Sequence, residues 1–253
     1  MLYPNKSIEI SEIISFLDAF LHADEFTDHC SNGLQIQGSP ASNGIIAGVS
    51  ISLSLIEYAI SKKINTLLVH HGLIWKNTPL LSLKGSMRKR LKVILENDIN
   101  LIGYHLPLDA NPDIGNNISI IRMLGDPAVI KPFDVGFIAI YDPPLGEDHI
   151  KRILHEKGLC QACYQLNRAS FRTIAAVSGG SSHLYEKAWE NGCDLFITGE
   201  IKEPTYRLID ELGTGYIAMG HYNSETFGIR NLCRVISEKF GLYAEFADIP
   251  NPY

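Results

Sequence analysis

The chain has 253 residues, of which 45 % are hydrophobic and 20 % are charged, with 21 glycines and 12 prolines. This composition excludes the disordered and fibrous classes, and the length favours two lobes or one large α/β unit. A net charge of −6 excludes a whole-surface field that attracts nucleic acid or anionic lipid.

The first 22 residues predict an amphipathic helix and not a signal peptide, because Glu9, Glu12 and Asp18 interrupt the apolar residues. No segment reaches the roughly 18 apolar residues that span a bilayer. Five cysteines, an odd number, fit reduced thiols better than a disulfide framework. We therefore expect a cytoplasmic protein without a membrane partner.

Residues 45–72 and 174–200 share a layout of an apolar run ending in Val-Ser, a helix and a second apolar run. They align at a constant offset of 128, from Val49 to Val177 (177 − 49) and from His70 to Thr198 (198 − 70). Few residues are identical in this register, so two unrelated β-α-β units remain an alternative. We expect an α/β fold of two similar lobes from an internal duplication, with mixed sheets flanked by helices. The expected lobes, which can interlock, are residues 1–125 and 126–253.

Two segments lie outside this repeated layout. The basic run 84–92 opens a helix that continues through Leu95, and we expect a solvated helix face, with anion capture or a subunit contact as the alternative. Turn residues in 125–172 surround the apolar run 136–141, which predicts a hairpin or edge structure connecting the lobes.

Ligands bind at the carboxyl ends of parallel strands, which directs attention to residues 70–71 and to 198–200. Three apolar runs end at a histidine, namely at His70, His105 and His221. Histidine does not favour the end of a strand, so we expect a functional site there. After Gly220 an apolar stripe predicts a helix that begins near residues 223–224 and ends at Gly241.

The adjacent His70 and His71 are candidate metal ligands. Neighbouring side chains of a strand point to opposite faces, so the pair converges only where the chain turns, and Gly72 can supply that turn. Two alternatives stay open: each histidine serves a different ion, or one is a core and the other a surface residue.

Two further pairs supply nitrogen and oxygen donors. Pro107 predicts an extended path that brings His105 and Asp109 to one face, with Asp109 as a ligand and His105 as a candidate proton carrier. His221 and Glu225 are four residues apart, so both can reach one ion if a helix has begun. Alternatively, Glu225 complements the positive helix N-terminus.

Three histidines and two carboxylates suit two divalent ions such as Zn, Mn or Fe. Two ions of about four ligands each need about eight bonds, and five residues with both carboxylates bridging supply about seven. Water or substrate must complete such a set. The open coordination is typical of a catalytic site.

The sequence resembles the GTP cyclohydrolase 1 type 2 homologue family, also described as NGG-interacting-factor-three-like or YbgI-type dinuclear metal proteins. The resemblance runs from about residue 28 to the C-terminus, is weakest in 125–172, and rests on DHCSNGLQIQG, LLVHHGLIWK, INLIGYHLPLDANPDIGNN, VSGGSS, DLFITGEIKE, GHYNSETFGIRNL and IPNPY. It implies a dinuclear centre between two related α/β lobes and a ring-shaped homohexamer. The ligands that it implies are His70, His71, Asp109, His221 and Glu225, with His105 adjoining.

Three functions follow as hypotheses. The first is a metal-dependent hydrolase of a purine nucleotide, as the family name implies, whose small-molecule substrate places its phosphates on the 84–92 run or on an anion-binding turn at Gly179-Gly180. The second is a non-catalytic metal-binding or interaction scaffold. The third is a nucleic-acid-processing phosphoesterase. The acidic chain lacks the interleaved aromatic and basic residues that bind nucleic acid tightly, so nucleic acid is an unlikely partner and this function is disfavoured.

Overall fold

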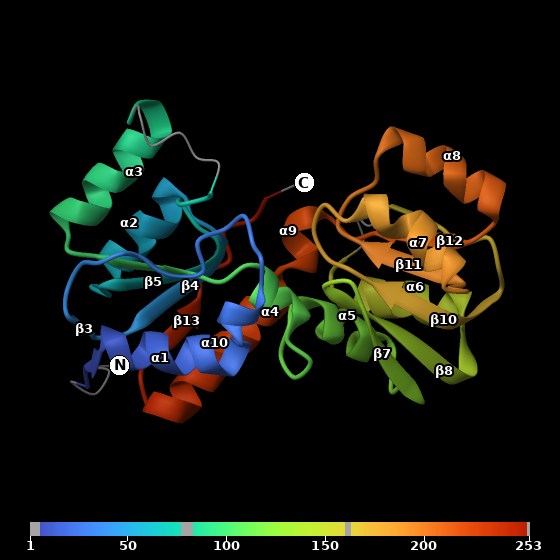
Figure 1. Cartoon of the computed structure of the whole chain (residues 1–253), viewed down its shortest axis with the longest axis horizontal. Helices are drawn as coiled ribbons and strands as arrows, with labels where there is room; N and C mark the ends of the chain where they lie inside the picture. Colours follow the sequence, from blue (N-terminus) through green and yellow to red (C-terminus); the bar gives the residue numbers. More distant parts are fainter. Residues whose placement is uncertain (1–5, 77–82, 160–162, 252–253) are drawn as a thin grey trace. The chain divides into compact units, whose positions relative to one another are not determined.

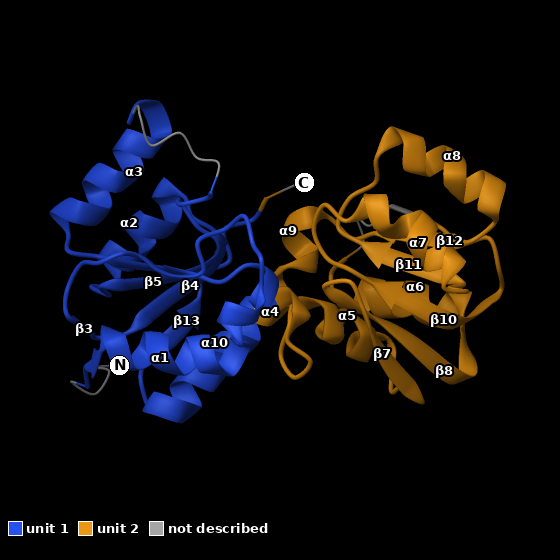
Figure 2. Cartoon of the chain, in the orientation of Figure 1, with its two compact units in different colours: residues 1–108, 229–250 blue, residues 109–228, 251–253 orange. Residues whose placement is uncertain are grey.

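The computed structural model describes residues 6–76, 83–159 and 163–251, and the chain forms two compact units (Figures 1 and 2). Unit 1 comprises residues 1–108 and 229–250, and unit 2 comprises residues 109–228 and 251–253. Two of the three crossings between the units fall inside helices, α4 (Leu106–Ala110) and α10 (Thr226–Phe240), and the third lies between residues 250 and 251. Among the described residues, none of the helices has the length and apolar character that a bilayer span requires.

Unit 1 is built on a mixed five-stranded sheet in the order β13-β4-β5-β6-β2. The first four strands are parallel, and β2 is antiparallel to β6. The strands and the helices of this unit are β1 (Ile8–Glu9), α1 (Ile10–Leu21), β2 (Gly33–Ile36), β3 (Ala41–Ser42), β4 (Ile45–Ser50), α2 (Leu53–Ser61), β5 (Thr66–His71), α3 (Gly85–Glu96), β6 (Asn100–Gly103) and β13 (Ala244–Phe246).

Helices cover both faces of the unit 1 sheet, which explains why its central strands are continuous apolar runs. Ile46, Leu67 and Leu101 are paired across the sheet and pack against α2 and α3. Their neighbours Ala47 and Leu68 are equally buried, and the alternation of side chains along a strand places them on the other face. Helices α1 and α10 cover that face (Figure 1). The predicted N-terminal helix and the helix after residue 84 are therefore α1 and α3.

Unit 2 is built on a mixed six-stranded sheet in the order β7-β8-β10-β11-β12-β9. Strands β10, β11 and β12 are parallel, and the others are antiparallel to their neighbours. The elements are α5 (Asn116–Leu124), β7 (Val129–Phe133), β8 (Gly136–Gly146), α6 (Glu147–Glu156), β9 (Cys163–Gln165), β10 (Ser170–Ala176), α7 (Tyr185–Glu190), β11 (Leu195–Thr198), α8 (Glu203–Leu212), β12 (Gly215–Ala218) and α9 (His221–Ser224).

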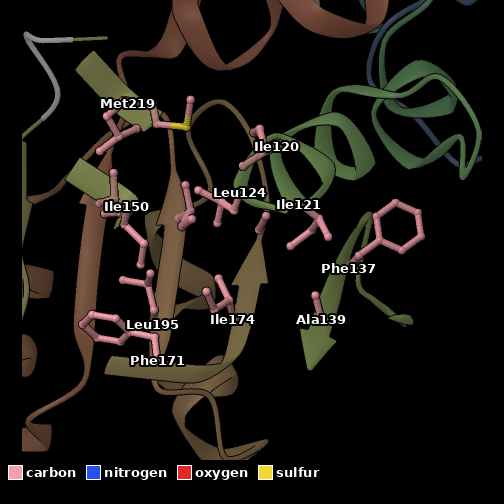
Figure 3. Close-up of a cluster of buried hydrophobic side chains, with 14 of the residues drawn as sticks. Ile120, Ile121, Leu124, Phe137, Ala139, Ile150, Phe171, Ile174, Leu195 and Met219 are labelled. Atoms are coloured by element: carbon pink, nitrogen blue, oxygen red, sulfur yellow. The ribbon is translucent and has the colours of Figure 1, made fainter. Parts of the chain in front are cut away.

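The core of unit 2 follows the two-residue period of its strands. Ile174 and Ala176 pack with residues of α5 and α6 (Figure 3), whereas Ala175 and Val177 pack with residues of α7 and α8. The hairpin predicted within 125–172 is β7 and β8, and it forms one edge of this sheet.

The pairing register of the two sheets repeats at the offset that the sequence predicts. Ile46 pairs with Leu67 in unit 1, and Ile174 pairs with Leu195 in unit 2, 128 residues further on in both strands (174 − 46 and 195 − 67). The common origin of the units stays a prediction.

A division of the chain at residue 125, as predicted for the two lobes, differs from the observed units in two segments. Residues 109–125 lie in unit 2 because α5 packs on β8 and β10. Residues 229–250 lie in unit 1 because β13 pairs with β4. Unit 1 is thus discontinuous in sequence.

Candidate metal centre

Unit 1 gathers three histidine side chains at the carboxyl ends of β5 and β6. The rings of His70 and His71 have centroids 4.7 Å apart, and that of His105 lies 5.0 Å from His70 and 5.6 Å from His71. One ring nitrogen from each lies within 4.8 Å of the other two. This group can hold a metal ion through imidazole nitrogens.

The turn after His71 is shaped by Gln35 from β2. The side-chain oxygen of Gln35 accepts hydrogen bonds from the backbone N–H groups of Leu73 (2.8 Å) and Ile74 (3.1 Å). A Cβ atom at Gly72 would lie 2.3 Å from that oxygen. Gly72 is therefore required for this close approach.

The extended path predicted for residues 105–109 is wrong. These residues lead into helix α4, which begins at Leu106 and contains Pro107 and Asp109. Proline is tolerated in the first turn of a helix because the N–H that it lacks would have no partner within the helix. His105 thus lies just before the helix and Asp109 within it, instead of on one face of an extended segment.

The Nδ1 atom of each of the three unit 1 histidines has a hydrogen-bond partner. The partner of His70 is the carbonyl oxygen of Tyr104 at 3.0 Å, that of His71 is the hydroxyl of Ser50 at 3.0 Å, and that of His105 is the carboxylate of Asp28 at 2.9 Å. A carbonyl or carboxylate only accepts, so it places the proton of a neutral imidazole on Nδ1. In His70 and His105 the lone pair is then on Nε2, as in histidines that bind metals, whereas the hydroxyl of Ser50 can either donate to Nδ1 of His71 or accept from it.

Asp28 is a residue of the candidate site that the sequence reasoning missed. Its carboxylate is buried at 3 % exposure. Burial alone raises the pKa of Asp28, but the hydrogen bond and charge of His105, together with the backbone N–H groups of Cys30 and Leu106, hold that pKa well below its usual range. Asp28 is therefore ionised at neutral pH. Asp28 is the first residue of DHCSNGLQIQG, one of the segments on which the family resemblance rests. That segment was the only sequence signal that could have pointed to Asp28.

Unit 2 holds Asp109 in a buried polar network. The Oδ1 atom of Asp109 accepts hydrogen bonds from the amide of Asn116 and the hydroxyl of Ser178, both at 2.8 Å. The amide oxygen of Asn116 in turn accepts from the N–H of Gly228 at 2.6 Å. Because Oδ1 is engaged twice, the carboxylate is fixed in one orientation.

Unit 2 also brings His221 and Glu225 together, as their spacing predicts. Nε2 of His221 lies 3.2 Å from Oε1 of Glu225, and Nδ1 lies 2.6 Å from Oε1 of Glu200. The hydrogen bond with Glu225 outweighs the effect of burial and raises the pKa of His221 to about 9, and Glu200 adds to this shift. A metal ion bound through Nε2 therefore displaces a proton, and its affinity falls as the pH falls.

Gly179 makes room for these two side chains. Its φ is +62°, and a Cβ atom there would lie 2.4 Å from Oε1 of Glu225 and 3.3 Å from Nε2 of His221. The backbone N–H of Gly179 donates to the hydroxyl of Ser224 at 3.0 Å. This N–H group is thus committed within the protein, which argues against the anion-binding turn expected at Gly179-Gly180.

Each unit therefore carries its own set of nitrogen and oxygen donors. Unit 1 supplies imidazoles with anchored Nδ1 atoms, and unit 2 supplies one imidazole and two buried carboxylates. This mixture fits borderline divalent ions such as Zn, Mn or Fe and lacks the thiolates of a closed structural zinc site.

The contact between Glu200 and His221 leads to a prediction. Glu200→Gln is expected to weaken metal binding by about tenfold, because an amide can donate to Nδ1 and move the imidazole proton to Nε2. Competition with a chromophoric chelator measures the affinity. Glu203→Gln, an exposed residue three positions later, is the control and should leave the affinity unchanged; equal affinities for all three proteins would contradict the prediction.

Comparison with known proteins supports the family resemblance that the sequence motifs indicate. Residues 8–252 match the family model described as Duf34/NIF3 (NGG1p interacting factor 3). The chain is 38 % identical over 251 residues to a protein of Haemophilus influenzae named GTP cyclohydrolase 1 type 2 homolog, covering 95 % of this chain and 98 % of that protein. A Pyrococcus horikoshii protein of the same name is 39 % identical over 247 residues, covering 94 % of this chain and 97 % of its own.

Solved structures agree with the fold. The structure of the protein ybgI, described as of unknown function, has a TM-score of 0.91 and 31 % identity, covering 97 % of this chain and all of its own. TTHA1606 from Thermus thermophilus has a TM-score of 0.90 and 30 % identity, covering 97 % of this chain and 100 % of its own.

Proposed function

Because the chain belongs to the Duf34/NIF3 family, we propose that it is a metal-dependent hydrolase of a purine nucleotide that holds two divalent ions. The proposed ligands are His70, His71, Asp109, His221 and Glu225. Further parts of the proposal are that the protein acts in the cytoplasm and assembles as a homohexameric ring.

One observation carries the metal-binding part of this proposal. The three histidines among the proposed ligands, His70, His71 and His221, each have Nδ1 held by an oxygen atom of the same unit. Structural histidines have no common reason to be anchored at the same nitrogen. Anchoring at Nδ1 prepares Nε2 as the donor atom, which is what coordination requires.

The chemistry of the proposed site divides between ions and side chains. When bound, two divalent ions lower the pKa of water and stabilise the charge that develops on the attacked group. The chain's own residues orient the donors: Asn116 and Ser178 fix Asp109, and Glu200 fixes His221. His105 is not among the proposed ligands, and its Nε2 is suited to accept the proton that an attacking water loses.

The nucleotide part of the proposal rests on the relatives. Several curated relatives with 34–39 % identity carry the name GTP cyclohydrolase 1 type 2 homolog. That name supports a purine nucleotide as the substrate to test first.

The test is removal and restoration of the metal. Chelation should abolish turnover of GTP by the purified protein, and re-addition of Mn, Zn or Fe should restore it, with the bound metal quantified in parallel. Absence of GTP turnover with every metal would overturn the GTP assignment. Tight binding of two ions with no turnover across a panel of nucleotides would instead support the metal-holding scaffold.

A further inference from the structure

We propose that Asp28 is a positioning residue that keeps the proton of His105 on Nδ1, so that Nε2 carries the lone pair of a ring that lies beside His70 and His71. The catalytic use of that lone pair rests on the proposed function. The position of the proton follows from the hydrogen bonds of Asp28 alone. It assigns a role to a buried carboxylate that belongs to none of the proposed ligand pairs.

The Asp28 carboxylate is held from both oxygens by four donors. Oδ1 accepts from the N–H of Cys30 (3.0 Å) and from Nδ1 of His105 (2.9 Å). Oδ2 accepts from the side-chain amide of Asn32 (3.1 Å) and from the N–H of Leu106 (2.9 Å). Every contact delivers a hydrogen atom to oxygen, so the site has room for an acceptor only.

The backbone of His105 is fixed by the same group of residues. Its N–H donates to the side-chain oxygen of Asn32 at 2.9 Å, while the amide of Asn32 donates to Asp28. Asp28 therefore holds the ring of His105 directly and its backbone through Asn32. One ring nitrogen of His105 lies within 4.8 Å of a ring nitrogen of His70 and of His71, and Nε2 is the nitrogen that carries the lone pair of the neutral ring when Nδ1 donates to Asp28.

The substitution Asp28→Asn places a hydrogen-bond donor where only an acceptor fits. The new NH₂ group must replace one of the two oxygens, and each oxygen faces one backbone N–H, of Cys30 or of Leu106, that cannot become an acceptor. On the Oδ2 side, the Asn32 amide could flip only by losing its bond to the N–H of His105. On the Oδ1 side, His105 can move its proton from Nδ1 to Nε2 and accept the new hydrogen bond. The variant should therefore switch the tautomer of His105.

The experiment is nitrogen NMR of the histidine rings in the chelated full-length protein, at a pH where imidazole is neutral, with signals assigned by His105→Gln. The wild type should show His105 protonated at Nδ1, and Asp28→Asn should show it protonated at Nε2. The control is Asp18→Asn, which makes the same carboxylate-to-amide change at the acceptor of the Tyr104 hydroxyl in the same unit (2.6 Å). This control should leave His105 protonated at Nδ1.

Two results would overturn the proposal. One is a wild-type protein in which the proton of His105 lies on Nε2. This measurement does not depend on whether any variant folds. The other is a folded Asp28→Asn protein in which the proton stays on Nδ1. Neither measurement uses a substrate, so a failed nucleotide assay leaves this test intact. If turnover is found, Asp28→Asn should lower kcat by about 100-fold at unchanged metal content, since a misplaced proton removes the acceptor.

Discussion

Gly179→Ala is expected to lower metal affinity by about 10- to 100-fold, the range found when residues that support metal ligands are altered. The added methyl carbon would lie 2.4 Å from Oε1 of Glu225 and 3.3 Å from Nε2 of His221. Glu225 is buried at 3 % exposure, so its carboxylate cannot move aside without displacing its neighbours. The affinity is measured by competition with a chelator, and bound metal by elemental analysis.

The matched control is Gly192→Ala in the same unit. Gly192 has a φ of +75°, close to the +62° of Gly179, but a Cβ atom there meets no atom within 4 Å. Both variants should lose roughly 1 kcal/mol or more of stability, because alanine is strained in the left-handed region. Only Gly179→Ala should lose metal. Equal losses of metal in the two variants would attribute the effect to backbone strain and refute the steric account.

Phe171→Ala is expected to lower the free energy of unfolding of unit 2 by about 3–5 kcal/mol, as is typical for deletion of a buried phenylalanine ring. Phe171 has 0 % exposure and lies in the cluster between the unit 2 sheet and helices α5 and α6 (Figure 3). A Cβ atom at Gly215 would lie 2.8 Å from the ring, which shows how closely β12 packs on it. Removal of the ring therefore leaves a cavity in a closely packed part of the core.

Urea denaturation followed by circular dichroism measures this loss. Val129→Ala is the control, because Val129 lies on the edge strand β7 with 41 % exposure and its truncation should change stability by less than about 0.5 kcal/mol. A loss below about 1 kcal/mol for Phe171→Ala would show that the cluster closes over the gap.

The strands and the histidines at their ends were predictable because the signals are local. The apolar runs that become β4, β5 and β10 have lengths typical of buried parallel strands, and the spacing of His221 and Glu225 predicts their contact directly. The error at Pro107 is local as well. Proline favours both extended segments and first helical turns, and the sequence alone does not decide between them.

The supporting residues could not be predicted because their partners are distant in the chain. Asp28 meets His105 across 77 positions, and Ser178 meets Asp109 across 69. Glu200 lies in a segment that the strand-end rule singled out, but its partner His221 is 21 positions away. Only tertiary structure brings such pairs together. Periodicity therefore locates the donors without showing what orients them.

The discontinuity of unit 1 has a consequence for the order of folding during synthesis. Strand β13 pairs Ala244 with Ile45 and Phe246 with Ala47, so β4 stays an uncovered sheet edge until residues 244–246 have left the ribosome. Residues 109–228 of unit 2 are contiguous and emerge earlier. Nascent chains released before residue 244 should therefore present a protease-resistant unit 2 joined to an incomplete, aggregation-prone unit 1.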